Sequence, residues 1–228
     1  ILYIQVGASF GEFAWNYLHD NMVGHMIQVH TDTAFLYENV LVHDNILTGA
    51  NPDNCRGMNV GVATDPSYGS FYNNLFVNLG QEFSSIAVYS GDWKVYNNTF
   101  YQIKASAAHF AGALLMGRAG CTIDAKNNIF SGDASVVYCQ TDGGASMSQY
   151  TLSNNCYYGN GNGPGGDASP VNADPLFVKA GGNDFRLQSG SPAKDAGTSA
   201  VSGTVTSDLN GVSRPQGSAY DIGAYEFE

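Results

Sequence analysis

Short apolar runs alternate with clusters of turn-forming residues along the chain. The clearest runs are aliphatic and often β-branched: Met26–Val29, Asn59–Val62, Ile86–Tyr89, Leu114–Met116 and Val136–Tyr138. Gly, Asn, Asp and Ser bound these runs, which is typical of β-strands. No stripe of apolar residues at helical spacing persists for ten residues outside the Gly-rich breaks. The pattern therefore predicts an all-β protein.

One short phrase follows the apolar runs and recurs six times, with Asn always at its third position. It begins as His-Asp-Asn at His19 and His43, and later copies read Tyr-Asn-Asn, Lys-Asn-Asn or Ser-Asn-Asn. The third-position residues are Asn21, Asn45, Asn74, Asn98, Asn128 and Asn155. Their spacings are 24, 29, 24, 30 and 27 residues. A period in this range indicates a solenoid.

The repeat favours a parallel β-helix of about six coils, each with two or three strands. The Leu consensus of a leucine-rich repeat, whose period is similar, is absent. Adjacent coils of a β-helix stack about 4.8 Å apart. Asn tolerates a left-handed backbone at a sharp turn. Its amide can also bond the equivalent amides one coil above and below. We therefore expect the six Asn residues to form a ladder.

Composition narrows the function. The chain has 228 residues, enough for one sizeable domain, and a net charge of −11. Nucleic acid is an unfavourable partner, because no basic stripe exists to neutralise phosphates. No run of 18 apolar residues indicates a membrane span. The chain opens in strand-like sequence without Met, so we expect a processed form or a C-terminal fragment. Cys55, Cys121, Cys139 and Cys156 lack metal-binding spacing, and both free thiols and disulfides remain open.

The regular pattern ends at the Gly-rich stretch 159–167. We divide the chain into coils over residues 1–168 and an irregular segment over 169–228. A solenoid needs a cap over its last coil, and the segment 169–228 is the candidate. This segment contains five charged residues, which we expect to hold the cap in place by charge-assisted bonds: Asp195, Asp208, Arg214, Asp221 and Glu226.

The coil phrases and the ending Asp221-Ile222-Gly223-Ala224-Tyr225-Glu226 resemble those of secreted bacterial right-handed parallel β-helix repeat proteins. That group includes relatives of pectate lyases and other polysaccharide lyases. The resemblance implies a right-handed β-helix, an extracellular or cell-surface location and carbohydrate-directed work. It does not identify a catalytic family, and the chain shows no lyase active-site signature.

One predicted column of side chains is acidic. Aligning the coils on the strand before the turn stacks Asp32, Asp65, Asp92, Ala119 and Asp142. Carboxylates about 5 Å apart in adjacent coils raise a pKa or recruit a cation, and their oxygens suit Ca²⁺. We predict a calcium site at Asp32, Asp65 and Asp92. The alternative is that each Asp only bonds the backbone of its own turn.

Cations beside this column could complete an active site. Arg118 enters where the Asp is missing, and Lys126 precedes the Asn of its own coil. We assign Arg118 or Lys126 the role of base or charge neutraliser, and Asp142 a substrate-binding role. A hydrolase is also allowed, because glycosidases use two carboxylates about 5 Å or roughly 6.5–9.5 Å apart. Asp32 with Asp65, or Asp65 with Asp92, would serve.

A second column lies two residues before the Asn, and its members are His19, His43, Tyr72, Tyr96, Lys126 and Ser153. Tyr rings suit the apolar faces of pyranoses and add a hydroxyl. We predict that His43, Tyr72 and Tyr96 contact substrate. The alternative is a ladder of like residues that stabilises the sheet.

Three functional hypotheses follow. The first is a polysaccharide lyase that acts on an acidic glycan with the assistance of Ca²⁺. The second is a non-catalytic glycan-binding or adhesin-type module, and the third is a glycoside hydrolase. All three share a polysaccharide or oligosaccharide partner. The sequence leaves the glycan and the oligomeric state open.

Overall fold

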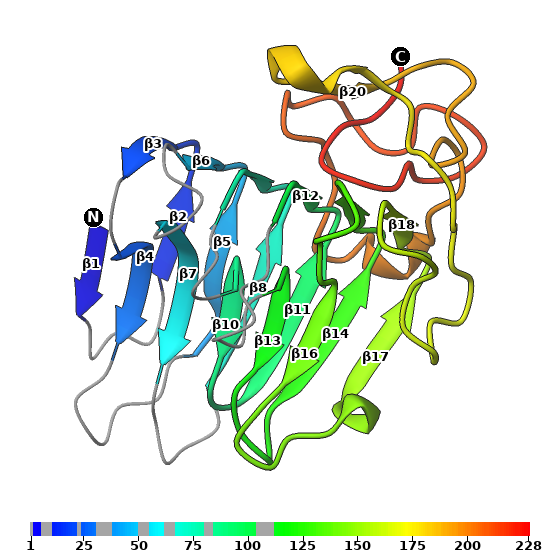
Figure 1. The fold of residues 1–228 in the computed structure, drawn as a ribbon. Helices are drawn as coiled ribbons and strands as arrows, with labels where there is room; N and C mark the ends of the chain where they lie inside the picture. The colour runs from blue at the N-terminus through cyan, green and yellow to red at the C-terminus, as the bar shows by residue number, and fades with distance from the viewer. Residues whose placement is uncertain are drawn as a thin grey trace.

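The computed structural model of the chain describes residues 2–5, 11–21, 24–30, 38–49, 55–61, 67–79, 84–103 and 112–228. These residues form three parallel sheets of six strands each, and successive strands along the chain belong to successive sheets. Every strand pairs with its equivalents in the neighbouring coils (Figure 1). The predicted all-β parallel β-helix is confirmed. No helix within the described residues is long and apolar enough to cross a membrane.

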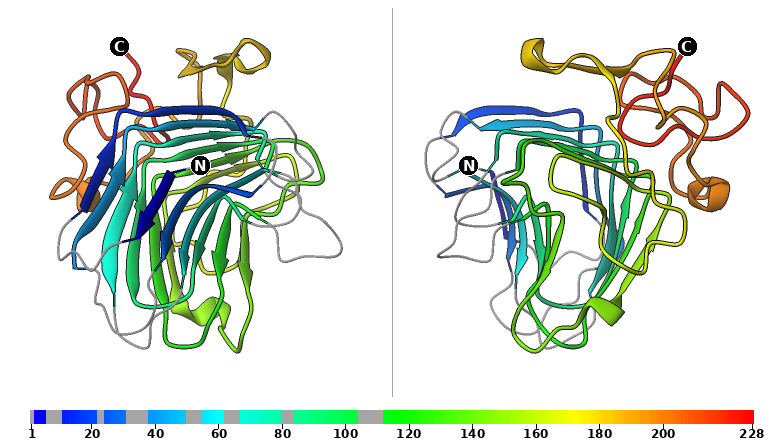
Figure 2. Two further views of the ribbon diagram at one scale, coloured as in Figure 1. Left: turned by 90° about the vertical axis from the view of Figure 1, so that its left-hand side faces the viewer. Right: turned by 45° about the vertical axis from the view of Figure 1, so that its right-hand side comes forward.

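Each coil visits sheets A, B and C in turn, and Figure 2 looks toward the ends of the stack. Sheet A comprises β1 (Leu2–Gln5), β4 (Gly24–His30), β7 (Cys55–Gly61), β10 (Ile86–Val88), β13 (Leu114–Met116) and β16 (Cys139–Thr141). Sheet B comprises β2 (Gly11–Ala14), β5 (Val40–His43), β8 (Tyr68–Tyr72), β11 (Asp92–Tyr96), β14 (Thr122–Lys126) and β17 (Tyr150–Ser153). Sheet C comprises β3 (Tyr17–Asn21), β6 (Ile46–Gly49), β9 (Leu75–Val77), β12 (Thr99–Tyr101), β15 (Ile129–Ser131) and β18 (Cys156–Tyr158).

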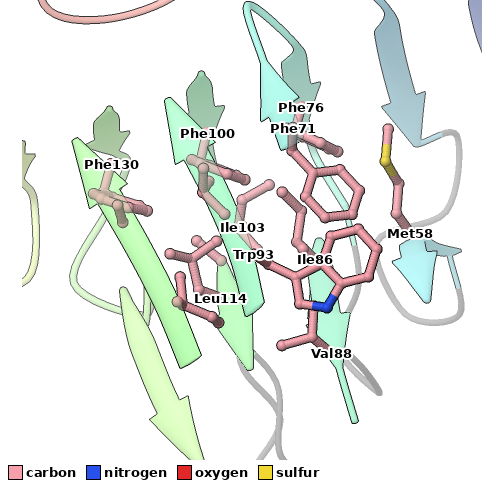
Figure 3. Packing of buried hydrophobic residues seen from close by; sticks show 14 of the residues in the cluster. Met58, Phe71, Phe76, Ile86, Val88, Trp93, Phe100, Ile103, Leu114 and Phe130 are labelled. Carbon is pink, nitrogen blue, oxygen red and sulfur yellow. The ribbon is translucent and has the colours of Figure 1, made fainter. Parts of the chain in front are cut away.

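Stacked aromatic side chains fill the interior. In sheet C, equivalent positions of neighbouring coils place the rings of Phe76, Phe100, Phe130 and Tyr157 in line, with centroids 4.8, 5.0 and 5.3 Å apart. The first three are visible in Figure 3. Trp93 of sheet B packs against Phe71 at 5.3 Å. Because all of these rings are at most 1 % exposed, their burial is a main source of stability.

The Asn ladder exists, but it begins at a different residue. Asn16, not Asn21, donates its amide to Oδ1 of Asn45 at 3.0 Å. Equivalent bonds of 2.9–3.0 Å continue through Asn74, Asn98, Asn128 and Asn155. Asn21 lies in β3 and pairs with Gly49. The residues from His19 to Asn21 therefore match the repeated sequence, but they do not occupy the equivalent positions of the first coil.

The two roles that we expected of the ladder Asn are divided between neighbouring residues. The residue before each ladder Asn has a left-handed backbone: Trp15, Asp44, Asn73, Asn97, Asn127 and Asn154, with φ from 52° to 60°. Four of these left-handed residues, at 73, 97, 127 and 154, point their amides away from the coil. They donate to backbone carbonyls of the C-terminal segment, at Ser207, Asp221, Thr198 and Ala196.

The C-terminal segment lies mostly along the side of the solenoid, next to sheet C (Figure 1). It contains β19 (Phe177–Lys179), β20 (Asp184–Leu187) and two short 3-10 turns, Ala180–Gly182 and Ser199–Val201; a third 3-10 turn, Met147–Gln149, precedes β17. Phe185 packs with Leu75 and Val77, and Ile222 with Ile129. By contrast, residues around 160–171 contact the final coil. The backbones of Cys156 and Val171 form an isolated β-bridge, and the backbone N–H of Asn160 donates to the Tyr138 hydroxyl. The segment that we assigned to a cap, 169–228, therefore mainly covers a flank.

Candidate functional site

The outer face of sheet B carries polar side chains in rows that run across the strands. β8, β11 and β14 alternate inward apolar residues with outward polar ones, for example Asp92, Lys94 and Tyr96 around Trp93 and Val95. Strand pairing places Asp92 between Tyr68 and Thr122 in one row, and Lys94 between Ser70 and Asp124 in the next. These residues share one face because side chains alternate along a strand.

A pocket of about 270 Å³ opens in this face. We call it the sheet B pocket; it is lined by Asn39, Tyr68, Gly69, Ser70, Asp92, Trp93, Lys94, Thr122 and Asp124. Ser70, 5 % exposed, is deeply placed, whereas Tyr68 is 46 % exposed beside it. Gly69 is paired with the inward-facing Trp93, and a Cβ at Gly69 would clash with the Val40 carbonyl oxygen and lie 2.6 Å from the Trp93 ring. A larger residue at this position would therefore displace the packing beneath the pocket.

Asp124 is fixed in this pocket from one side. Nζ of Lys126 lies 2.6 Å from both of its carboxylate oxygens, and the Tyr96 hydroxyl donates to Oδ2 at 2.5 Å. Burial, together with Asp124, raises the pKa of Tyr96, so this hydroxyl remains a donor at neutral pH. Asp92 accepts a bond of 2.5 Å from the Thr122 hydroxyl. The pocket therefore presents two carboxylates whose positions are held by neighbouring groups.

The predicted column of His43, Tyr72, Tyr96, Lys126 and Ser153 is confirmed as a register of paired residues. His19 is not part of it, because Ala14 pairs with His43. The His43 and Tyr72 rings stack at 4.5 Å. However, Val201, Val205 and Tyr220 of the C-terminal segment pack on Tyr96, which is 4 % exposed.

This burial changes the role that the column can have. His43 is only 7 % exposed and is held between Glu12 at 2.9 Å and Asp44 at 2.6 Å. Burial lowers its pKa, but the hydrogen bonds to Asp44 and Glu12 outweigh this effect, and the net pKa is raised. Tyr72 is half-buried, and burial, with the nearby Asp44 and Glu12 carboxylates, raises its pKa to about 12. His43 and Tyr96 offer a ligand little surface, which favours the sheet-stabilising alternative for them.

The acidic column is only partly within the described residues. Asp32 and Asp65 lie outside them, so the calcium site remains a prediction. The alignment used to build the column is wrong for the later coils. Stacking Asp92, Ala119 and Asp142 would require the residues three positions earlier, Tyr89, Met116 and Cys139, to pair with one another. In the structure Val88 pairs with Met116, and Met116 with Thr141.

The cause is that the turns between the strands of sheets A and B differ in length. Asp92 therefore begins β11 and pairs with Tyr68 and Thr122. Asp142 instead follows β16, and its backbone N–H donates to the Met116 carbonyl at 2.8 Å. Across the described ranges, no group of three or more His, Cys, Asp or Glu side chains could hold a metal ion.

Arg118 and Lys126 are not brought together. Arg118 is exposed in the turn before β14, and Lys126 is at the far end of that strand, paired with Asp124. Of the predicted site residues that the structure describes, only Asp92 lines the pocket, while Lys126 supports it through Asp124. Tyr68, Ser70, Lys94 and Asp124 were missed. Their signal was the alternation of polar residues in Tyr68–Tyr72, Asp92–Tyr96 and Thr122–Lys126.

The three thiols that the structure describes provide no alternative site, and the Cys55 side chain lies outside the described residues. Cys121, Cys139 and Cys156 are unpaired. Burial raises the pKa of all three, that of Cys156 to about 12. A thiol that stays protonated is a poor nucleophile and metal ligand.

Comparison with known proteins adds no assignment: the chain matches no protein-family model, and no curated protein matches it significantly.

Proposed function

We propose that the protein is a carbohydrate-directed β-helix that binds a glycan on the outer face of sheet B, at the sheet B pocket. One observation carries the proposal: a solvent-open hollow combines the exposed Tyr68 ring with the side chains of Asp92, Lys94 and Thr122. An aromatic ring suits the apolar face of a pyranose. Fixed acceptors and donors beside that ring suit its hydroxyl groups.

The shape of the face also suits a chain-like ligand. Each row of the pocket crosses several strands, so equivalent positions repeat about every 4.8 Å along the solenoid. Beyond the pocket, the row through Ser70 and Lys94 continues to Thr151, which is exposed. An extended glycan could therefore follow the stack of coils and meet polar groups in several of them.

A hydrolase is the second candidate, because two carboxylates lie in the same pocket. Asp124 is two residues beyond the partner of Asp92 on the adjacent strand, which separates their Cα atoms by roughly 8 Å. Inverting glycosidases hold their carboxyl groups roughly 6.5–9.5 Å apart. Asp92 and Asp124 replace the Asp32–Asp65 and Asp65–Asp92 pairs as the best-placed carboxylates within the described residues.

The test is affinity electrophoresis of the whole chain through gels containing a panel of soluble polysaccharides. We expect at least one glycan to retard the protein. Tyr68→Ala should abolish that retardation, whereas Tyr17→Ala should preserve it, because Tyr17 is similarly exposed (60 %) but lies outside the pocket. Absence of retardation by any glycan, or equal retardation of Tyr68→Ala, would contradict the proposal.

Measuring the products formed from a bound glycan distinguishes a lyase, a hydrolase and a non-catalytic binding module. A lyase would produce an unsaturated product that absorbs in the near ultraviolet, and a hydrolase would release reducing ends without that absorption. Loss of the reducing ends in both Asp92→Asn and Asp124→Asn would support the hydrolase. Retention without turnover would identify a binding module.

A further inference from the structure

Acidic and basic side chains lie close together on the outer face of sheet B. Within the described part of that face, the carboxylates are those of Glu12, Glu38, Asp92 and Asp124, and the amines are those of Lys94 and Lys126. The guanidinium of Arg118 is exposed in the turn before β14. Both oxygens of Asp124 bind Lys126, so that amine is already neutralised. His43, where it is protonated, lies between Glu12 and Asp44. In the described part of this face, Lys94 and Lys126 therefore each have a carboxylate as a neighbour.

Among the described residues, Lys94 is the single cationic side chain that lines the pocket. It lies on the same face as Asp92, two residues earlier in β11, and its partner in the adjacent strand is Asp124. An incoming carboxylate that approached Lys94 would therefore meet the Asp92 carboxylate and also that of Asp124, whose charge Lys126 partly offsets. Like charges at these separations oppose binding, and the whole chain, at −11, adds to the opposition.

The same groups suit an uncharged ligand. Carboxylates accept hydrogen bonds from hydroxyl groups, and such charge-assisted bonds are about twice as strong as neutral ones. The Lys94 amine can donate to hydroxyl or ring oxygens, and the Thr122 hydroxyl, whose proton is donated to Asp92, can accept a bond from a ligand. Asp124 is oriented by Lys126 and Tyr96 before any ligand arrives, which reduces the ordering needed on binding.

We infer, resting on the proposed glycan-binding function, that the sheet B pocket selects an uncharged pyranose unit of a neutral glycan and rejects uronate units. This specificity differs from the acidic glycan that the sequence led us to expect.

The test is titration calorimetry of the whole chain with matched oligomers of equal length: glucose, galactose and mannose oligomers, each against its uronic acid counterpart. We expect every pair that binds to favour its neutral member by at least about tenfold in Kd, which corresponds to 1.4 kcal/mol. Because the neutral ligand carries no charge, its Kd should change less than about twofold between low and high salt.

Two further measurements sharpen the result. Asp92→Asn should weaken binding of the neutral oligomer by about fivefold, since a charged acceptor becomes a neutral one, and should strengthen any residual uronate binding. Glu228→Gln, an exposed carboxylate outside the sheet B pocket, removes the same charge as a control and should leave both affinities unchanged.

Tighter binding of a uronate oligomer, or of a cationic amino-sugar oligomer than of its N-acetylated form, would overturn the inference while leaving the glycan-binding function intact. Failure of every oligomer and polysaccharide to bind would instead reject the proposed function and the inference with it.

Discussion

Asn155 donates its side-chain amide to Oδ2 of Asp167 at 2.8 Å. Asp167 thus takes the place that an Asn of a further coil would occupy, and it also accepts the Tyr157 hydroxyl at 2.9 Å. An ionised carboxylate accepts hydrogen bonds but cannot donate one. The ladder that begins at Asn16 therefore ends on a residue that satisfies the last amide and passes no bond onward.

Removing an interior member of the ladder should destabilise the fold strongly. Asn98 is fully buried; its amide donates to Phe71, Tyr96 and Asn128, and its oxygen accepts from Asn74. Asn98→Ala leaves several buried groups unpaired, at about 1–3 kcal/mol each. We expect urea unfolding to show a loss of at least about 3 kcal/mol.

The matched control is Asn16→Ala. Asn16 is the first member of the ladder within the described residues, and its side chain is half-buried. This substitution should cost clearly less than Asn98→Ala. Equal losses for the two variants would show that the ladder bonds do not determine the effect.

The Asn127 side chain should hold the C-terminal segment on the solenoid. Its amide donates to the Thr198 carbonyl at 3.0 Å, and its oxygen accepts the Thr198 N–H at 2.8 Å. Asn127→Gly removes both bonds but keeps the left-handed backbone accessible. We expect faster hydrogen exchange around residues 197–200, with little change in β11 and β14. Asn78→Gly, at an exposed left-handed position with φ 53°, should not change exchange in that segment.

The buried ion pair of the C-terminal segment should be more sensitive than an exposed one. Arg214 and Glu226 lie 2.7 Å apart with side chains 0 % and 1 % exposed, and Asp208 and Asp221 are buried beside them. Arg214→Met leaves these carboxylates without their cation and should cost about 3–5 kcal/mol. The exposed pair of Arg186 with Asp184 is the comparison.

Arg186→Met should destabilise the protein far less than Arg214→Met, because an exposed ion pair contributes little to stability. The double variant Arg214→Met/Glu226→Gln should be more stable than the sum of its single losses predicts, because it removes both buried charges. Additive losses in denaturant unfolding would contradict an interaction between the two residues.

His43 should make stability depend on pH. Its pKa is raised above 6.5 in the folded chain, because the bonds to Asp44 and Glu12 outweigh the effect of burial. The protonated form therefore stabilises the fold fully below pH 6.5, and this contribution is lost as pH rises through the raised pKa. The difference in unfolding free energy between the wild type and His43→Gln should be larger at pH 5.5 than at pH 8.5. Glu12→Gln, which removes one partner, should reduce that pH dependence in the wild-type background.

The repeat of Asn residues was sufficient to predict the architecture and the register of the turn between sheets B and C. The His43, Tyr72 and Tyr96 column followed from it correctly, because no insertion separates that column from the ladder. The first coil was misplaced, since His19–Asn21 copies the phrase while Ala14-Trp15-Asn16 supplies the geometry.

The candidate site was harder to predict, for two physical reasons. Asp92 was aligned through turns of variable length, and a shift of one residue moves a side chain to another row or face. The burial of Tyr96 depends on Val201, Val205 and Tyr220, more than 100 residues away, which no local pattern encodes. Lys94 and Asp124 were visible as alternating polar residues, but only strand pairing shows that they are neighbours.

The returning C-terminal segment has a consequence for how this chain folds. Solenoid coils contact only their neighbours, so they can form in any order and fray separately. Here, Asn73 bonds Ser207 across 134 positions, and Thr99 bonds Ala224 across 125. These contacts can form only after several coils have stacked, which makes them a late step. Once formed, they link the coils from Asn73 to Asn154, and we therefore expect these coils to unfold together and not one by one.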